Sequence, residues 1–383
     1  MNEKEVAEIR RRFRADRSAI THIQGCYVNE SREIVSRFDQ SLAMMTPEET
    51  EKLLALLRRT LSGSLGKNLM DITFATKQVV EGEEHRLLMA LRNSRLTDEE
   101  AIQTFFQRVI QSLELEGSYL ILLAHDAYDV PYRGGDGEEL ADGSDQVFSY
   151  ILCSVCPVKQ TKPALSYYVH ENAFHSLTAN WVISPPEVGF LFPAFDDRST
   201  NLYGALYYCR DTGDNHAAFV DAVFRTPPPM APAVQKETFQ TVLADSLGED
   251  CSLEVVQAVH EQLSQCIDLH KESKVPDTLL VSKEQVKDVL TSSGVSQEHI
   301  AKFSVDYDDV FGFEAELHPK NVIDNKHFEI RTPDVSIQVN PERSDLIETR
   351  IIGGAKYLLI PADENVEVNG VPIHIEEKEK APC

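Results

Sequence analysis

The chain contains 383 residues, 42% of them hydrophobic and 26% charged, which is typical of a folded globular protein and excludes general disorder. The N-terminal segment has no apolar core of signal-peptide length, and the longest purely apolar run, residues 119–124, is far shorter than the ~20 residues of a membrane span. We therefore expect a cytoplasmic protein without membrane contact. Seven scattered cysteines, an odd number, predict reduced thiols rather than a disulfide framework.

The net charge of −25 is unevenly distributed along the chain. Lys and Arg number 17 against 18 Asp and Glu in residues 1–115, but 20 against 44 in residues 116–383. Such an acidic surface repels phosphate, so nucleic-acid contact is disfavoured and would have to come from an N-terminal arginine cluster. The members of this cluster are Arg10, Arg11, Arg12, Arg14 and Arg17. Because acidic residues interleave with them, a solvated helix face is the favoured interpretation.

The first part of the chain predicts helices and one hairpin. Residues 3–17 have apolar side chains at helical spacing and predict a short charged helix. The alternation in residues 18–40 predicts a β-hairpin. Capping boxes then predict one helix that begins at Thr46 and another that begins at Thr97. The intervening residues 67–95 are expected to be helical as well.

Four apolar runs follow one another in residues 118–209: SYLILLAHD, VFSYILCSVC, VGFLFPAF and NLYGALYYC. Their odd and even positions are both apolar, so they predict a central sheet that needs cover on both faces. Residues 132–145, rich in glycine and acidic residues, predict an exposed and mobile hairpin tip. A calcium loop is the alternative, but the ligand spacing of known calcium loops is missing.

Two further patterns in this region invite a chemical interpretation. Cys153 and Cys156 have Cys-x-x-Cys spacing, but residues three apart on a strand point to opposite faces, so buried packing is favoured over metal or redox use. Five tyrosines give the region an aromatic character, for which core packing and the filling of sheet edges are favoured over a binding groove. They are Tyr167, Tyr168, Tyr203, Tyr207 and Tyr208.

The second part of the chain begins at the proline run of residues 226–232, which cannot continue a helix or a central strand. Helices are expected after it, and then short alternating strands with a type I′ turn at Asn369-Gly370. The sequence thus predicts an α+β protein whose central, mainly antiparallel sheet is covered by helices. The expected divisions are a charged N-terminal helix (1–17), a domain of hairpin, helices and central sheet (18–226), a Pro-rich linker with a helical segment (227–317), a small C-terminal antiparallel β unit (318–376) and a charged tail (377–383).

Polar side chains at two predicted strand ends are the candidate site. Histidine beside carboxylates can act as a general base or a metal ligand, and the acidic pair at the other strand end can supply partners if the two strands are neighbours. The alternative without a functional role is a polar strand end that leads into a charged loop. The candidates are His125, Asp126, Asp129, Arg133, Asp196 and Asp197, with His125 and Asp126 as the metal candidates. No phosphate loop, nucleophile elbow or His-Glu-x-x-His motif occurs, and no cofactor is predicted.

The stretches YLILLAHDAYDVPYR (119–133) and GGAKYLLIPADENVEVNGVPI (353–373) resemble a family of bacterial proteins classed as a domain of unknown function. The order of elements over residues 18 to about 375 also resembles that of the bacterial nucleoid-associated protein family of about 37 kDa, a likeness of arrangement and not of sites. Neither resemblance implies catalytic residues. The charge of this chain departs from what a DNA-coating protein needs.

These patterns favour a non-enzymatic protein that binds a macromolecule or assembles with itself. The expected partner is a protein or a second copy of the chain, because an acidic body with a nearly neutral head suits charge-steered association. The first alternative is a metal-dependent hydrolase or nuclease that uses His125, Asp126 and Asp129. The second is a nucleoid-associated-like protein that contacts DNA through the N-terminal arginine cluster.

Overall fold

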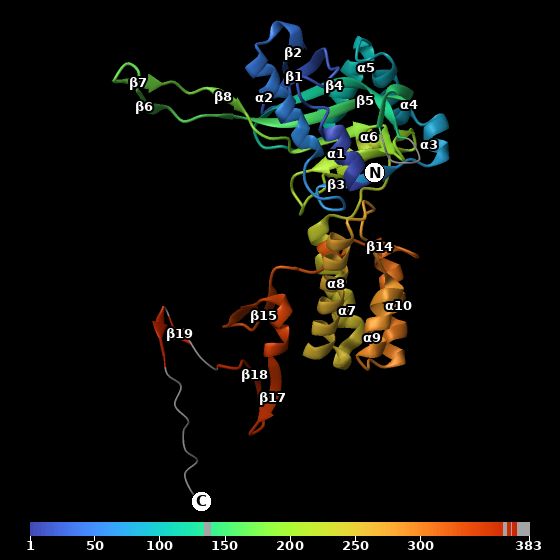
Figure 1. Ribbon diagram of the computed structural model, residues 1–383, viewed down its shortest axis with the longest axis vertical. Helices are drawn as coiled ribbons and strands as arrows, with labels where there is room; N and C mark the ends of the chain where they lie inside the picture. Colours follow the sequence, from blue (N-terminus) through green and yellow to red (C-terminus); the bar gives the residue numbers. More distant parts are fainter. Residues whose placement is uncertain (134–138, 363–365, 369, 374–383) are drawn as a thin grey trace, which may run out of the picture. The chain divides into compact units, whose positions relative to one another are not determined.

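The computed structural model describes residues 1–133, 139–362, 366–368 and 370–373. The chain forms two compact units, one of residues 1–236 with 275–278 and the other of residues 237–274 with 279 onward (Figure 1). Helices and antiparallel strands occur in both units, which confirms the predicted α+β class. No helix among the described residues is long and apolar enough to cross a membrane.

An antiparallel sheet organises the first unit, with the strand order β2-β1-β4-β5-β9-β12-β3 and β8 paired to β5. The four apolar runs of the sequence become β4, β5, β9 and β12, which are neighbours at its centre, as predicted. The strands are β1 (His22–Val28), β2 (Ile34–Ser41), β3 (Leu69–Thr73), β4 (Ser118–Arg133), β5 (Glu139–Gln160), β8 (Trp181–Ile183), β9 (Val188–Phe192) and β12 (Gly204–Cys209).

Helices cover both faces of this sheet. On one face, Leu123, Cys153 and Phe190 pack against α4 (Glu83–Asn93), α5 (Glu99–Ser112) and α6 (Ala217–Phe224). On the other face, Leu122 and Leu152 pack with α1 (Glu3–Arg10) and α2 (Pro47–Arg58). The apolar runs therefore bury both their odd and their even positions, as their composition requires.

The Cys-x-x-Cys pair is divided between the two faces. Cys153 belongs to the core beneath α4, α5 and α6, and Cys156 to the core beneath α1 and α2. Both side chains are 0% exposed. Burial raises the pKa of the Cys156 thiol to about 12 and that of Cys153 well above its ordinary value. The two thiols cannot share a metal ion, because they point away from each other.

Alkylation of the native protein at pH 8 should spare Cys153 and Cys156, because thiolates are the reactive species and both pKa values are raised. The partly exposed Cys266 should react under the same conditions and serves as the internal control. Peptide mass mapping before and after denaturation checks this expectation. Rapid native labelling at Cys153 or Cys156 would contradict the burial described above.

Three details of the first unit differ from the sequence-based expectation. Residues 69–73, expected to be helical, form the edge strand β3, because Leu69, Met70 and Ile72 are buried in pairing with β12; α3 (Thr76–Glu81) and α4 follow it. The helix expected to be capped by Thr97 is capped by Asp98, which accepts from the backbone N–H of Ala101 at 3.1 Å. The first helix ends at Arg10, earlier than expected. The capping box at Thr46 is confirmed.

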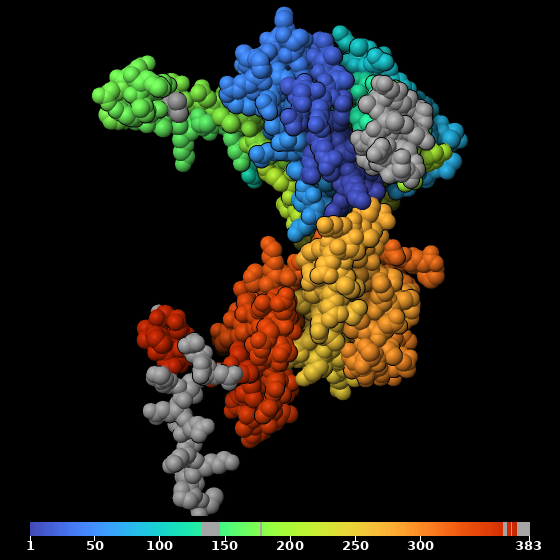
Figure 2. Space-filling model, viewed as in Figure 1, coloured from blue at the N-terminus to red at the C-terminus, as the bar shows by residue number. Residues whose placement is uncertain are grey.

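A long ribbon continues β5 beyond the sheet, and we call residues 159–183 the arm (Figures 1 and 2). It consists of the end of β5, β6 (Ala164–Tyr168), β7 (Ala173–Leu177) and β8. The pairs Val158↔Ile183 and Tyr168↔Ala173 share one register, so the two sides stay aligned from base to tip. The sequence patterns did not predict this element.

The second unit has a helical core followed by short strand pairs. Ser252 caps α8, and a capping box at Ser282 begins α9. The C-terminal strands pair antiparallel, as expected, but as three separate pairs rather than a joined sheet. The elements are α7 (Pro232–Leu247), α8 (Leu253–Ser273), β13 (Val281–Ser282), α9 (Lys283–Ser292), α10 (Gln297–Phe311), β14 (Glu316–Leu317), α11 (Pro319–Val322), β15 (Phe328–Arg331), β16 (Ser336–Val339), β17 (Glu348–Ile352), β18 (Ala355–Leu359), β19 (Glu367–Val368) and β20 (Val371–Pro372). The predicted turn residue Asn369, the charged tail (377–383) and residues 134–138 of the predicted hairpin tip (132–145) lie outside the described residues. The remaining residues of that tip belong to β4 and β5 rather than to a loop.

Candidate functional site

The candidate residues on β4 are divided between the two faces of the sheet. His125 and Asp126, which were predicted to stand at a strand end, lie in the middle of this strand, because the pairing with β5 continues to Arg133. Asp126 is 1% exposed and lies in the layer beneath α1. His125, its neighbour in the strand, points to the opposite face, where it lines a cavity. Asp129 is exposed, and the side chain of Arg133 lies outside the described part of the chain. The three side chains expected to share a metal ion therefore do not meet.

Asp126 is an anchor for the segment that follows α1. Its carboxylate accepts two hydrogen bonds from Arg12, both at 3.3 Å, and one from Tyr150 Oη at 2.8 Å. The backbone N–H groups of Ala19 and Ala127 donate to the same carboxylate, at 2.9 and 3.0 Å. Five donors saturate the roughly four lone-pair sites of a carboxylate. Asp126 therefore has a structural role: its hydrogen bonds hold the N-terminal segment against the sheet.

The second strand end is also tied to α1. Glu8 accepts from Arg198 at 2.6 and 2.8 Å and from Tyr128 Oη at 2.8 Å. Arg198 also donates to the carbonyl of Pro131 at 2.8 Å, so the two strand ends are neighbours, as the sequence-based hypothesis required. Asp196 accepts from Asn201 at 2.6 Å. The two strand ends are thus joined by the Glu8–Arg198 ion pair and by the hydrogen bonds that these two side chains make.

Asp197 and the N-terminal arginine cluster face solvent to different extents. Asp197 is exposed. Arg12 is paired with Asp126 and lies 5.0 Å from the centre of the Tyr128 ring, so it is engaged inside the fold. Arg14 pairs with Asp16 at 3.1 Å. The partly buried Arg10 and the exposed Arg11 and Arg17 complete the cluster. Among the described residues, no group of three or more His, Cys, Asp and Glu side chains could hold a metal ion.

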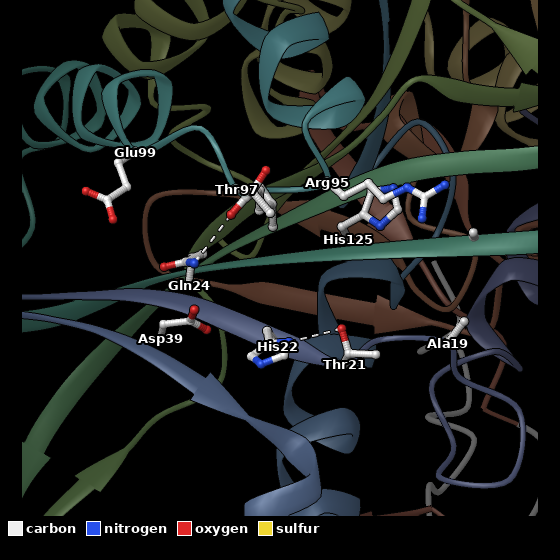
Figure 3. A pocket seen from close by; sticks show the side chains of 11 residues that line it. Ala19, Thr21, His22, Gln24, Asp39, Arg95, Thr97, Glu99 and His125 are labelled. Atoms are coloured by element: carbon white, nitrogen blue, oxygen red, sulfur yellow. Dashed lines mark hydrogen bonds between the residues drawn. The ribbon is translucent and has the colours of Figure 1, made fainter.

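The cavity beside His125 has a volume of about 560 Å³ and lies between the strands β1, β2 and β4 and the connection from α4 to α5 (Figure 3). Polar and charged side chains dominate its wall. They include His22, Gln24, Asp39, Arg95, Glu99 and His125. Gln24 donates to the carbonyl of Leu96 at 3.4 Å, which links β1 to the α4–α5 connection. A cavity of this size lies within the range of small-molecule sites, about 300–1,000 Å³.

His125 is held in place as a neutral ring. Its Nε2 atom lies 2.8 Å from Ser149 Oγ. Burial lowers the pKa of His125, and the nearby Arg95 and Arg92 lower it further, against the opposing effect of Asp126. Arg92 is itself fixed by a 2.7 Å hydrogen bond to the carbonyl of Ser149. At neutral pH the imidazole therefore offers a hydrogen bond and no charge.

The arm exposes a strip of apolar side chains. Leu165 is 71%, Tyr167 47% and Phe174 69% exposed. Tyr167 lies opposite Phe174 in the register, with ring centroids 5.2 Å apart, and Leu165 is two residues from Tyr167 on the same strand. The three side chains therefore share one face of the ribbon. Val169, at the turn, is 76% exposed.

A family model described as a domain of unknown function, DUF4317, matches residues 1–371. The chain belongs to this family. The match includes residues of both compact units and confirms the resemblance to a family of unknown function; the nucleoid-associated resemblance is not shown. Neither the curated proteins nor the solved structures contain a match to this DUF4317 chain.

Sequence reasoning missed two features of the DUF4317 chain, Arg95 and the arm. Arg95 follows the end of α4. Its place on the cavity wall depends on the positions of β1 and β4, which no motif near Arg95 in the sequence predicts. For the arm, the tyrosines were the available signal. Tyr207 and Tyr208 are buried, as favoured, whereas Tyr167, Tyr168 and Tyr203 are 46–47% exposed. Core packing is therefore wrong for these three.

Proposed function

We propose that this protein is a non-enzymatic assembly protein that associates with a second copy of itself through the arm. The observation that carries the proposal is the apolar face of the arm, formed by Leu165, Tyr167 and Phe174. Exposed apolar side chains gathered on one face are a common mark of interaction surfaces. Two such faces can pack against each other by a twofold axis, which makes the contact self-complementary.

The charge of the chain favours contact between arms over contact between bodies. The arm contains Lys159, Lys162 and Glu171, a net charge of +1, whereas the remaining residues carry −26. Two such acidic bodies repel each other. The ten residue steps from Val158 to Tyr168 extend the ribbon by roughly 33 Å, several times the Debye length of about 8 Å at physiological salt. Contact at the tips therefore leaves the body charges screened from one another.

The arm offers a matched pair of substitutions to test this proposal. Tyr167 and Tyr168 are adjacent and both 47% exposed, but they point to opposite faces of the ribbon. Tyr167→Asp places a charge in the proposed contact, so we expect self-association to weaken about 100-fold or more, about 2.7 kcal/mol. Tyr168→Asp should change it less than about threefold. Sedimentation velocity over a concentration series measures both.

Salt gives a second readout of the same proposal. Lowering the ionic strength to about 10 mM, where the Debye length reaches about 30 Å, should weaken wild-type self-association, because the acidic bodies then repel each other across the arms. Raising it above physiological salt should change self-association little. A wild-type chain that remains monomeric at concentrations on the order of 100 µM in high salt would overturn the proposal. Equal weakening by Tyr167→Asp and Tyr168→Asp would also reject it, since the contact would then not depend on the apolar face.

A further inference from the structure

The cavity beside His125 has unpaired charge of both signs on its wall. Arg95 lies at one end beside His125, and Asp39 and Glu99 lie at the other, together with Gln24 (Figure 3). Within the described part of the chain, no ion pair engages Arg95, Asp39 or Glu99. Three exposed charged side chains thus line one cavity without neutralising each other.

The strand register sets the distance between the two ends. Asp39 on β2 lies opposite Gln24 on β1, and Ala124 on β4 lies opposite Ile23 on β1. Asp39 and His125 are therefore two strand spacings apart across the sheet and two residues apart along it. At about 4.8 Å per spacing and 3.3 Å per residue, their backbones are separated by roughly 12 Å.

Each end offers a different kind of partner. Arg95 presents a planar guanidinium that suits a carboxylate, and it is the one Arg or Lys among the described residues of the wall. The neutral ring of His125, fixed by Ser149, adds a hydrogen-bonding group without a second charge. Asp39 and Glu99 suit an ammonium group at the opposite end. A ligand with one charge would satisfy only one end.

We propose that this cavity binds a small zwitterion of the size of a short peptide, with its carboxylate against Arg95 and His125 and its ammonium group against Asp39 and Glu99. An extended chain spans about 3.3–3.6 Å per residue, so three residues place the two charges about 10 Å apart, which matches the separation of the two ends. The proposal is independent of the arm and of self-association.

Trialanine, N-acetyl-trialanine and trialanine amide are the probes, since the second lacks the ammonium group and the third lacks the carboxylate. Binding to the full chain is followed by two-dimensional NMR and by titration calorimetry. We expect trialanine to bind, with shifts at residues of the cavity wall, and each singly charged probe to bind about tenfold more weakly or worse. Equal binding of all three, or no binding of trialanine at about 10 mM, would overturn the proposal.

Variants separate the two ends. Arg95 has a backbone φ of 54°, which glycine adopts freely, so Arg95→Gly removes the guanidinium without new backbone strain. This variant should bind trialanine and trialanine amide equally, whereas the double variant Asp39→Asn/Glu99→Gln should bind trialanine and N-acetyl-trialanine equally. Glu100→Gln, next to Glu99 but away from the cavity wall, is the control and should keep wild-type selectivity. A thermal unfolding curve identifies any variant that fails to fold, and Arg95→Asn, which tolerates the same φ and also lacks the charge, then replaces Arg95→Gly. Wild-type selectivity in the folded end variants would refute the assignment of the ends.

Discussion

Asp126→Ala is expected to lower the free energy of unfolding of the first unit by about 3 kcal/mol. Removing one partner of a buried ion pair costs about 3–5 kcal/mol, and the 17% exposure of Arg12 places this case at the lower end. The substitution also leaves Tyr150 Oη and the N–H groups of Ala19 and Ala127 without their acceptor. Hydrogen exchange measured by mass spectrometry on peptides of residues 1–20 and of β4 reports the loss where it occurs.

Asp129→Ala is the matched control for this prediction. Asp129 is the same residue type on the same strand, but it is exposed, so its loss should change stability by less than about 0.5 kcal/mol. The pair also separates an anchor from a catalytic role for Asp126. Nuclease or hydrolase activity with Mg²⁺ or Mn²⁺ that disappears in Asp126→Ala at unchanged stability would favour the metal-dependent enzyme instead.

Phe190→Ala should destabilise the first unit by about 3–5 kcal/mol, the usual cost of deleting a buried aromatic ring. Phe190 is 0% exposed at the centre of the sheet. Its ring lies 5.9 Å from that of Phe105, 6.5 Å from that of Phe219 and 5.1 Å from that of Phe224, so it joins β9 to the helices above. Hydrogen exchange on peptides of β9 and α5 measures the change.

Phe174→Ala is the corresponding control, because Phe174 is 69% exposed on the arm. Its loss should leave the stability of the sheet within about 0.5 kcal/mol of wild type. Self-association should weaken in the same variant. A stable fold with wild-type protection in Phe190→Ala would contradict the described core, whereas a destabilised sheet in Phe174→Ala would mean that the arm packs on its own body.

The sequence predicted the helices and strands that are determined by residues close together in the chain. Thr46 and Glu49 are three residues apart, so their capping box can be read without knowing anything distant. The strands β4, β5, β9 and β12 were predictable because each is apolar on both faces, which few other contexts permit. Strand β3 was not predictable, because it has only five residues and its partners in β12 lie more than 130 positions away in the chain.

The sequence indicated part of the region where the polar side chains gather, but it did not predict what those side chains do. The candidates Asp126 and Asp196 were both expected at strand ends, but Asp126 lies in the middle of β4; Pro131, near the end of that strand, accepts from Arg198, which follows β10 (Ala194–Asp196). Their partners, Arg12 for Asp126 and Asn201 for Asp196, could not be deduced, since the first is 114 residues distant. The face to which His125 points follows from strand alternation, but the cavity there depends on the connection after α4.

The pairing of β3 with β12 imposes an order on events during protein synthesis. Thr73 leaves the ribosome long before its partner Gly204, which is 131 residues later in the chain. At roughly 5–20 residues per second, the edge strand waits several seconds or more for its neighbour. During that interval the buried face of β3 has no sheet to join, so the nascent chain exposes an apolar segment that chaperones can bind. Codon usage between residues 73 and 204 would set the length of this exposure.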